Sequence, residues 1–209
     1  MLNGYTKLNF GHLYQSQKTG DSPNYLKAYS QSRYDIYPTT ERMSKIRFDL
    51  AKKLFKFSSI LDFGYGNGSF LKTCKENGIE TYGYDISDYP LPTGITKTET
   101  HQIEVDLITF FDSIEHLEEV KLETFLSKLH TNQIIISVPW LHEISDDWFF
   151  HWKHRRENEH FHHFTASGLA LLMEKAGFIP IWHGCPEDEI RTAESNLPNI
   201  LTMAGARIE

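Results

Sequence analysis

From about residue 39 to its C-terminus, the chain alternates short apolar runs with amphipathic stretches. Short apolar runs bounded by turn residues are typical of buried strands, and apolar positions three or four residues apart are typical of helices. We therefore expect strands around 60–61, 81–85, 105–111, 133–138, 178–183 and 200–207, and helices over 39–57, 68–77, 114–129 and 165–176. This alternation predicts a mostly parallel sheet with helices on both faces. The short link between the last two strands is compatible with one antiparallel strand.

Two segments lack a clear pattern. Residues 1–38 show little periodicity and are rich in Tyr, Ser, Asn and Gly, which predicts an irregular extension or lid. Residues 89–103 are compatible with a weak strand at most. A chain of 209 residues suits one domain with an extension. We expect an N-terminal extension and lead-in helix over 1–56, followed by a single α/β domain over 57–209.

Composition narrows the possible partners and compartment. The formal net charge of −7 disfavours nucleic acid and anionic membranes, although Lys153 to Arg156 form a local basic patch. The two cysteines, Cys74 and Cys185, are far apart, so a disulfide framework or a thiolate zinc site is not expected. The N-terminus lacks the pattern of a signal peptide, and no apolar run is long enough to span a bilayer. We expect a cytoplasmic protein without a membrane partner.

A glycine-rich turn, Asp62-Phe-Gly-Tyr-Gly-Asn-Gly68, lies where the first strand of the domain leads into a helix. Glycines at such a turn let a ligand approach the backbone, and the following helix offers free N–H groups. A dinucleotide fingerprint aligned on Gly64 would place its third glycine at Ser69. The acid two residues before Gly64 suits a cationic amino group and offers nothing to a pyrophosphate. A tight turn without any ligand is the structural alternative.

Asp85 ends the next predicted strand, about twenty residues beyond the glycines. A carboxylate at this place can accept hydrogen bonds from both hydroxyls of a ribose. The alternative is an acid that caps the following helix. Together, the turn and Asp85 predict a site for an adenosine-containing ligand.

Five segments, in order, resemble the class I S-adenosylmethionine-dependent methyltransferases. They read ILDFGYGNGSF, YGYDIS, VDLITFFDSIEHL, IIISVPW and HFHHFTASGLALLMEKAGF. The last segment is most similar to the branch that includes ubiquinone-biosynthesis-type and sugar-tailoring enzymes. The resemblance covers about residues 58–207 and implies a Rossmann-like, doubly wound α/β fold. Its sheet would have seven mostly parallel strands with an antiparallel last strand, and the cofactor would be S-adenosylmethionine.

The resemblance also implies roles for individual residues. Asp62, Gly64 and Gly66, with Tyr65 in the same turn, would line the methionine part of the cofactor. Asp85 would bind the ribose hydroxyls and Ile86 would pack on the adenine. Phe111 and Asp112 would flank the methionine part and open onto the acceptor. The segment that contacts the adenine amino group in the family corresponds to the short region 89–103, so no residue is assigned to that contact.

Candidate residues for the chemistry follow the strand ends. His116, next to the expected cofactor mouth, is suited to act as a general base for a hydroxyl acceptor. A surface or helix-capping histidine is the alternative. Trp140, His142 and His163 are candidates for the acceptor pocket, although for Trp140 an aromatic wall is the favoured interpretation.

The sequence also lacks the motifs of nucleic-acid methylation. Phe-Asp-Ser-Ile stands where amino-methylating nucleic-acid enzymes have Asp/Asn-Pro-Pro-aromatic, and no Pro-Cys nucleophile is present there. These departures, with the acidic charge, favour a small-molecule or sugar acceptor that is methylated on oxygen or nitrogen.

The stretch HWKHRRENEHFHHF, residues 151–164, holds five histidines. His160 and His162 share a face if the segment is extended, and His151 and His154 share one if it is helical. Glu157 and Glu159 are near, but no carboxylate is firmly placed to complete a ligand set, so we assign no metal. A metal site stays the alternative.

Three functions remain open after this reading. The first is methyl transfer to a small acceptor, which we favour. The second is a nicotinamide-dependent Rossmann oxidoreductase, which the position of Asp62 disfavours. The third is a non-catalytic cofactor-binding or interaction domain with the tyrosine-rich N-terminus as its arm. The sequence leaves the acceptor and the oligomeric state open.

Overall fold

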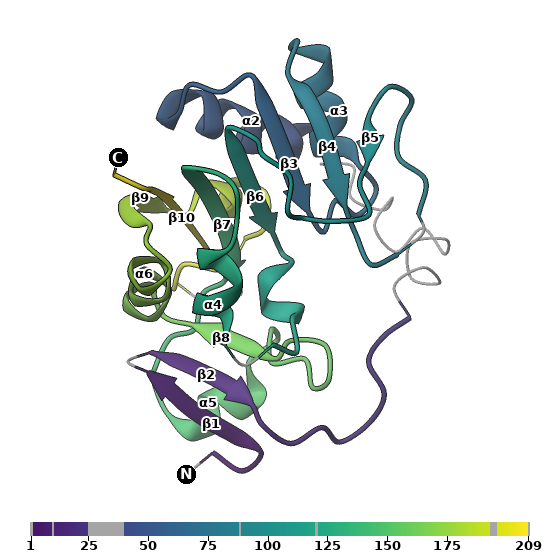
Figure 1. Cartoon of the computed structure of the whole chain (residues 1–209). Coiled ribbons are helices and arrows are strands. Elements are labelled where there is room, and N and C mark those ends of the chain that lie inside the picture. Colours follow the sequence, from purple (N-terminus) through teal and green to yellow (C-terminus); the bar gives the residue numbers. More distant parts are fainter. Residues whose placement is uncertain are drawn as a thin grey trace.

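The computed structural model describes residues 2–9, 11–24, 40–87, 89–119, 121–192 and 196–208 (Figure 1). Its main sheet has seven strands in the order β5-β4-β3-β6-β7-β10-β9. They are β3 (Ser59–Phe63), β4 (Glu80–Tyr84), β5 (Thr96–Lys97), β6 (Leu107–Phe111), β7 (Gln133–Pro139), β9 (Ile179–Gly184) and β10 (Ile200–Ala206). β5 is the weak strand allowed for in the region 89–103.

Strand direction follows the expected pattern. The neighbours from β5 to β7 pair in parallel, and β10 pairs antiparallel with both β7 and β9. The predicted mostly parallel seven-stranded sheet with an antiparallel last strand is confirmed. Its parallel strands end at one edge, where ligands of such sheets bind.

Both faces of the sheet are covered, because apolar residues occupy both sets of alternating positions in the central strands. One set, such as Leu61 and Ile108, packs against α4 (Leu122–Ser127) and α6 (Ala166–Lys175). The other, such as Ile60 and Leu107, packs against α2 (Thr40–Leu54) and α3 (Ser69–Glu76). The prediction of helices on both faces is therefore confirmed.

The predicted helix over 114–129 is wrong. The chain forms a 3₁₀ turn, η1 (Ile114–His116), and resumes a helix only at α4. Leu117 is extended, with φ −70° and ψ 130°, so it ends the turn. Burial of Ile114 and Glu115 beneath the sheet edge overrides the helical spacing of the apolar residues.

The prediction that residues 1–38 are irregular is wrong for their first part. β1 (Tyr5–Asn9) and β2 (His12–Gln15) form an antiparallel hairpin, and β2 pairs with β8 (His162–Phe164) in a second sheet. Figure 1 shows this sheet beside α5 (Asp146–His151), away from β5. The strands are short, and two distant contacts stabilise them: the pairing of β2 with β8, and the packing of Tyr5 and Leu13 against Phe149 of α5. Residues 25–38, the last part of the expected lid, lie outside the described residues, as does Thr39 at the start of the predicted helix.

A further 3₁₀ turn, η2 (Pro186–Glu189), lies in the connection between β9 and β10. Within the described ranges, no helix has the length and apolar character needed to cross a membrane.

Candidate active site

A cavity of about 270 Å³ opens at the carboxyl ends of β3, β4 and β6. All nine residues predicted for the cofactor and for catalysis line it: Asp62, Gly64, Tyr65, Gly66, Asp85, Ile86, Phe111, Asp112 and His116. Residues of α2 and of the loop between α5 and β8 close its remaining sides. The structure thus brings together residues that the sequence spreads over three segments.

The glycine turn needs its glycines. Gly64 and Gly66 have φ values of +80° and +55°, which side chains other than glycine rarely adopt. A Cβ on Gly64 would also lie 2.6 Å from the Cβ of Ser113. The backbone of this turn therefore borders the cavity without a side chain at Gly64 or Gly66 in between.

Asp85 ties the end of β4 to this turn. One of its carboxylate oxygens accepts a hydrogen bond from the Gly66 amide at 3.0 Å, and the other accepts one from the Ser87 amide at 2.7 Å. Each carboxylate oxygen can accept a second hydrogen bond. Ile86, beside it on the cavity wall, is 74% exposed, so an apolar surface is available there for a flat ligand.

Asp62 is the buried acid of the cavity, with only 3% of its surface exposed. It pairs in register with Thr109 of β6, whose hydroxyl donates a 2.7 Å hydrogen bond to it. Burial raises the pKa of Asp62 to about 7, and the Thr109 hydrogen bond and the charge of Arg47 offset part of that rise. A cationic ligand group beside Asp62 would restore its charged form.

Four charged side chains close the cavity between α2, β6 and η2. Arg47 donates to Glu187 from Nε and Nη2, at 2.9 Å each, and from Nη2 to Asp112, also at 2.9 Å. Arg191 donates to both oxygens of Asp112 at 2.7 Å and to Glu187 at 3.1 Å. Burial alone would raise the pKa of Asp112, but Arg191 and Arg47 hold it well below its usual range.

This network also holds Asp112 at φ +53°, a conformation that is rare for a residue other than glycine. Sequence reasoning missed Arg47, Glu187 and Arg191. Arg47 lies on an amphipathic helix, where an arginine normally indicates a solvent-exposed face, and Glu187 and Arg191 lie outside the five segments that resemble the family, so no local signal marked them.

The far end of the cavity carries histidines. His116 and His160 line it, with ring centroids 4.6 Å apart and their planes at 89°. The Nδ1–H of His116 donates to the backbone carbonyl of Glu159 at 2.8 Å, because a carbonyl only accepts. Burial lowers the pKa of both histidines, and the neighbouring His116 adds to the effect on His160. Both are therefore neutral at pH 7, and Nε2 of His116 carries a lone pair.

The three residues predicted for the acceptor pocket do not line this cavity. The ring of Trp140 stacks on His142 at 5.4 Å, and Nε2 of His142 lies 2.7 Å from the carbonyl of Pro198. His163 is buried among the rings of Tyr5, Phe149 and Trp152. The pocket at the sheet edge is formed without them.

The histidine stretch divides into different environments. His154 and His160 line the cavity, whereas the side chain of His151 is 78% exposed. His162 contacts His12 of the hairpin, with ring nitrogens 2.8 Å apart. Its richness in histidine therefore reflects several separate contacts, of which only two reach the candidate site.

Comparison with known proteins agrees with this geometry. A model of the methyltransferase domain family matches residues 33–181, more than half of the chain. The chain belongs to the methyltransferase domain family. This membership confirms the predicted class I S-adenosylmethionine-dependent methyltransferase. No curated protein sequence matches the chain significantly.

Several solved methyltransferase structures share the fold at low identity. The Burkholderia thailandensis 1,6-didemethyltoxoflavin-N1-methyltransferase, solved with its substrate and S-adenosylhomocysteine, has a TM-score of 0.66 and 14% identity over 98% of this chain and 99% of that one. A putative Haloferax volcanii methyltransferase in complex with the activator Trm112 has a TM-score of 0.63 and 12% identity over 91% and 100%. Magnesium protoporphyrin IX methyltransferase from Synechocystis, with bound S-adenosylhomocysteine, has a TM-score of 0.54 and 14% identity over 90% of both chains.

Proposed function

We propose that this methyltransferase transfers the methyl group of S-adenosylmethionine to an oxygen or nitrogen of a small-molecule acceptor. One observation carries the proposal. Two carboxylates, Asp62 and Asp85, stand at the ends of adjacent parallel strands on one wall of a cavity whose far end carries histidines. The first wall suits a ligand with an amino group and a ribose, and the far end suits the acceptor.

The cofactor end would use the predicted residues. The carboxylate of Asp62 would pair with the ammonium group of the methionine part, directly or through water, beside the open backbone of Gly64 and Gly66. Asp85 would accept the ribose hydroxyls on the lone pairs that its two backbone hydrogen bonds leave over. Ile86 would cover the adenine with its exposed side chain. Tyr65, Phe111 and Asp112 would complete the wall towards the transferred methyl group.

The acceptor end would use His116. A hydroxyl or amine of the acceptor attacks the methyl carbon in line, the bond from that carbon to sulfur breaks, and its electron pair stays on sulfur. The acceptor proton moves to Nε2 of His116, the ring nitrogen that can accept it because Nδ1 already carries the hydrogen. Alignment of the two substrates in the cavity supplies much of the remaining rate.

The net charge of the chain and the polar residues of the cavity indicate what kind of acceptor would bind. An acidic chain without the motifs of nucleic-acid methylation favours a small molecule. The Burkholderia neighbour, with a bound small-molecule substrate, shows that this fold can accommodate such an acceptor. Arg156 and Glu159, which line the cavity near the histidines, provide polar groups that would orient an acceptor there.

The test is an unbiased search for products. Purified enzyme is incubated with S-adenosylmethionine carrying a ¹³C-labelled methyl group and a small-molecule extract, and labelled products are measured by mass spectrometry. We expect a labelled product that forms in step with S-adenosylhomocysteine and is reduced at least tenfold by His116→Ala. His142→Ala, outside the cavity, is the matched control and should leave the yield unchanged. Equal loss in both variants, or a labelled polymer in place of a small product, would contradict the proposal.

A further inference from the structure

Glu115 is a buried acid without a hydrogen-bond partner. Only 1% of its surface is exposed, and neither carboxylate oxygen has a hydrogen-bond partner among the described residues. Leaving a carboxylate in this state is costly, because burial removes its water and nothing replaces it. A buried acid that the fold does not satisfy indicates a ligand that does.

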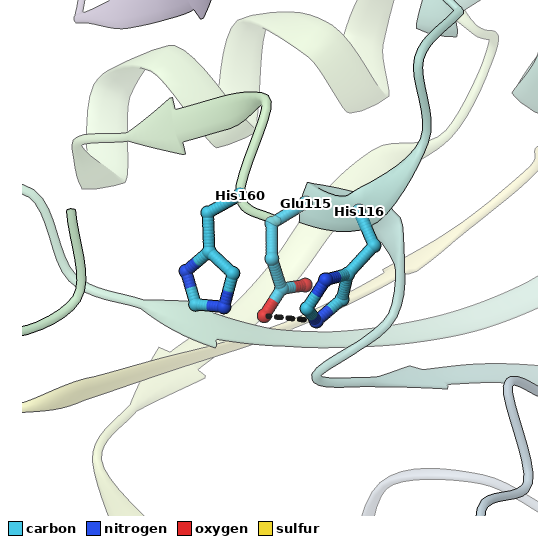
Figure 2. Close-up of side chains that lie close together, drawn as sticks. All are labelled: Glu115, His116 and His160. Carbon is cyan, nitrogen blue, oxygen red and sulfur yellow. Dashed lines mark ion pairs between the residues drawn. The ribbon is translucent and has the colours of Figure 1, made fainter. Parts of the chain in front are cut away.

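Two imidazoles flank this carboxylate. Figure 2 shows the carboxylate of Glu115 between His116, from the same turn η1, and His160, from the loop before β8. Nε2 of His116 lies 4.0 Å from a Glu115 oxygen. One ligand atom from each of the three residues lies within 4.8 Å of the other two.

The second contact of His116 suits metal binding. Its Nδ1–H donates to the carbonyl of Glu159, which fixes the ring and leaves the lone pair of Nε2 on the side of Glu115. Histidine ligands of metals usually donate their other ring N–H to a carbonyl or a carboxylate in this way.

We propose that Glu115, His116 and His160 bind one divalent transition-metal ion at the acceptor end of the cavity. Ligands of one zinc ion at its usual bond lengths of about 2.0–2.2 Å lie roughly 3–4 Å apart, so a small closure of the three side chains would complete the set. Two imidazoles and one carboxylate favour zinc, iron or cobalt over magnesium. The proposal replaces the expectation that the histidine stretch leaves no metal site, since it adds the carboxylate that the stretch lacked.

The role of the ion rests on the proposed function. Three protein ligands leave positions open, and His116 and His160 line the cavity, so an acceptor oxygen can bind there. Binding lowers the pKa of the acceptor hydroxyl, which releases its proton to solvent before the oxygen attacks the methyl carbon. The ion then takes the place of His116 as the group that activates the acceptor. Methyl transfer by His116 alone would still be possible without it.

The test is metal binding by the untagged full chain after treatment with a chelator. Zinc ions are titrated by calorimetry, and the melting temperature is measured with and without zinc. We expect one zinc ion per chain and a rise in melting temperature that follows its binding. Glu115→Gln and His160→Ala should each weaken zinc binding at least tenfold. His151→Ala, which removes an exposed histidine, should leave it unchanged.

Two further measurements separate this proposal from its alternatives. Without metal, Glu115→Gln should melt no lower than the original chain, because an amide of the same size replaces a carboxyl group that makes no hydrogen bond among the described residues. A carboxyl group with a structural role would give a lower melting temperature for the variant. S-adenosylhomocysteine should bind the Glu115→Gln variant normally, so loss of the metal and loss of the cofactor are distinguishable. Absence of stoichiometric zinc binding, or zinc binding that survives both Glu115→Gln and His160→Ala, would overturn the metal site.

Discussion

The two ends of the cavity are built in different ways. At the cofactor end, Asp85 and the glycine turn hold each other through hydrogen bonds between residues that lie within about twenty positions in the chain. The acceptor end is formed by segments that are far apart in the chain, namely η1, α2, η2 and the loop between α5 and β8. In this part of the cavity Glu115 has no hydrogen-bond partner among the described residues. The first end is a local motif that the strand ends position, whereas the second exists only once the whole domain has folded.

This difference indicates which part of the site sets specificity. A motif formed by neighbouring strand ends can be kept while the segments around it change. The acceptor end depends on loops and on charged contacts between distant elements. We infer that the acceptor end determines which acceptor this protein methylates, while the cofactor end binds the same cofactor whatever the acceptor is.

We expect the largest loss of stability when the ion-pair network of Arg47, Asp112, Glu187 and Arg191 is broken. Glu187 is fully buried and pairs with both Arg47 and Arg191. Glu187→Ala would leave two partly buried guanidinium groups with Asp112 as their single acidic partner, which should cost about 3 kcal/mol of unfolding free energy in urea. Glu189→Ala, two residues on, breaks an exposed pair with Arg42 and should cost no more than about 1 kcal/mol. Similar costs for the two variants would show that the buried network does not hold the acceptor end.

At the cofactor end, Asp62→Asn should weaken binding of S-adenosylhomocysteine by about 10- to 100-fold, the value of a hydrogen bond to a charged group. Since burial raises the pKa of Asp62 to about 7, the acid is increasingly neutral below that pH. Affinity for S-adenosylhomocysteine should therefore fall as the pH drops below 7, and this dependence should vanish in Asp62→Asn. Calorimetry from pH 5.5 to 8.5 measures both effects, and an equally steep dependence in the variant would exclude Asp62 as its cause.

The same acid should make the ligand-free protein less stable at high pH. A carboxyl group whose pKa is raised on folding favours the folded state while it is protonated, and this advantage is lost as the pH rises through about 7. Asp62→Asn should therefore raise the melting temperature of the ligand-free protein more at pH 8 than at pH 5. An equal rise in melting temperature at pH 5 and pH 8 would mean that ionisation of Asp62 does not destabilise the folded protein.

A smaller effect is expected at Asp85. Asp85→Ala should weaken binding of S-adenosylhomocysteine at least tenfold, because it removes the ribose acceptor and the anchor of the Gly66 amide. Asp85→Asn keeps one side-chain oxygen and should lose less. Unchanged affinity in Asp85→Ala would remove the ribose assignment and, with it, the contrast between the two ends.

The sequence predicts the cofactor end of the cavity better than the acceptor end. The parallel direction of the first strands and the placement of Asp62, Gly64 and Asp85 at the strand ends follow from local patterns, because alternation and turn residues act within one βαβ unit. The β1–β2 hairpin and Glu187 could not be predicted in this way. The hairpin pairs with the distant strand β8, and buried Glu187 is neutralised in part by Arg47, which is distant in the sequence. The group of Glu115, His116 and His160 could have been found from the sequence. Glu115 is the neighbour of His116, and the histidine-rich stretch lies in a connection that returns to the same edge of the sheet.

The central claim is that the cavity at the ends of β3, β4 and β6 binds S-adenosylmethionine. Calorimetric titration of the purified chain with S-adenosylhomocysteine and, separately, with NADH tests it most directly. We predict one S-adenosylhomocysteine bound per chain and no binding of NADH. Binding of NADH without binding of S-adenosylhomocysteine would contradict the account and would favour an oxidoreductase.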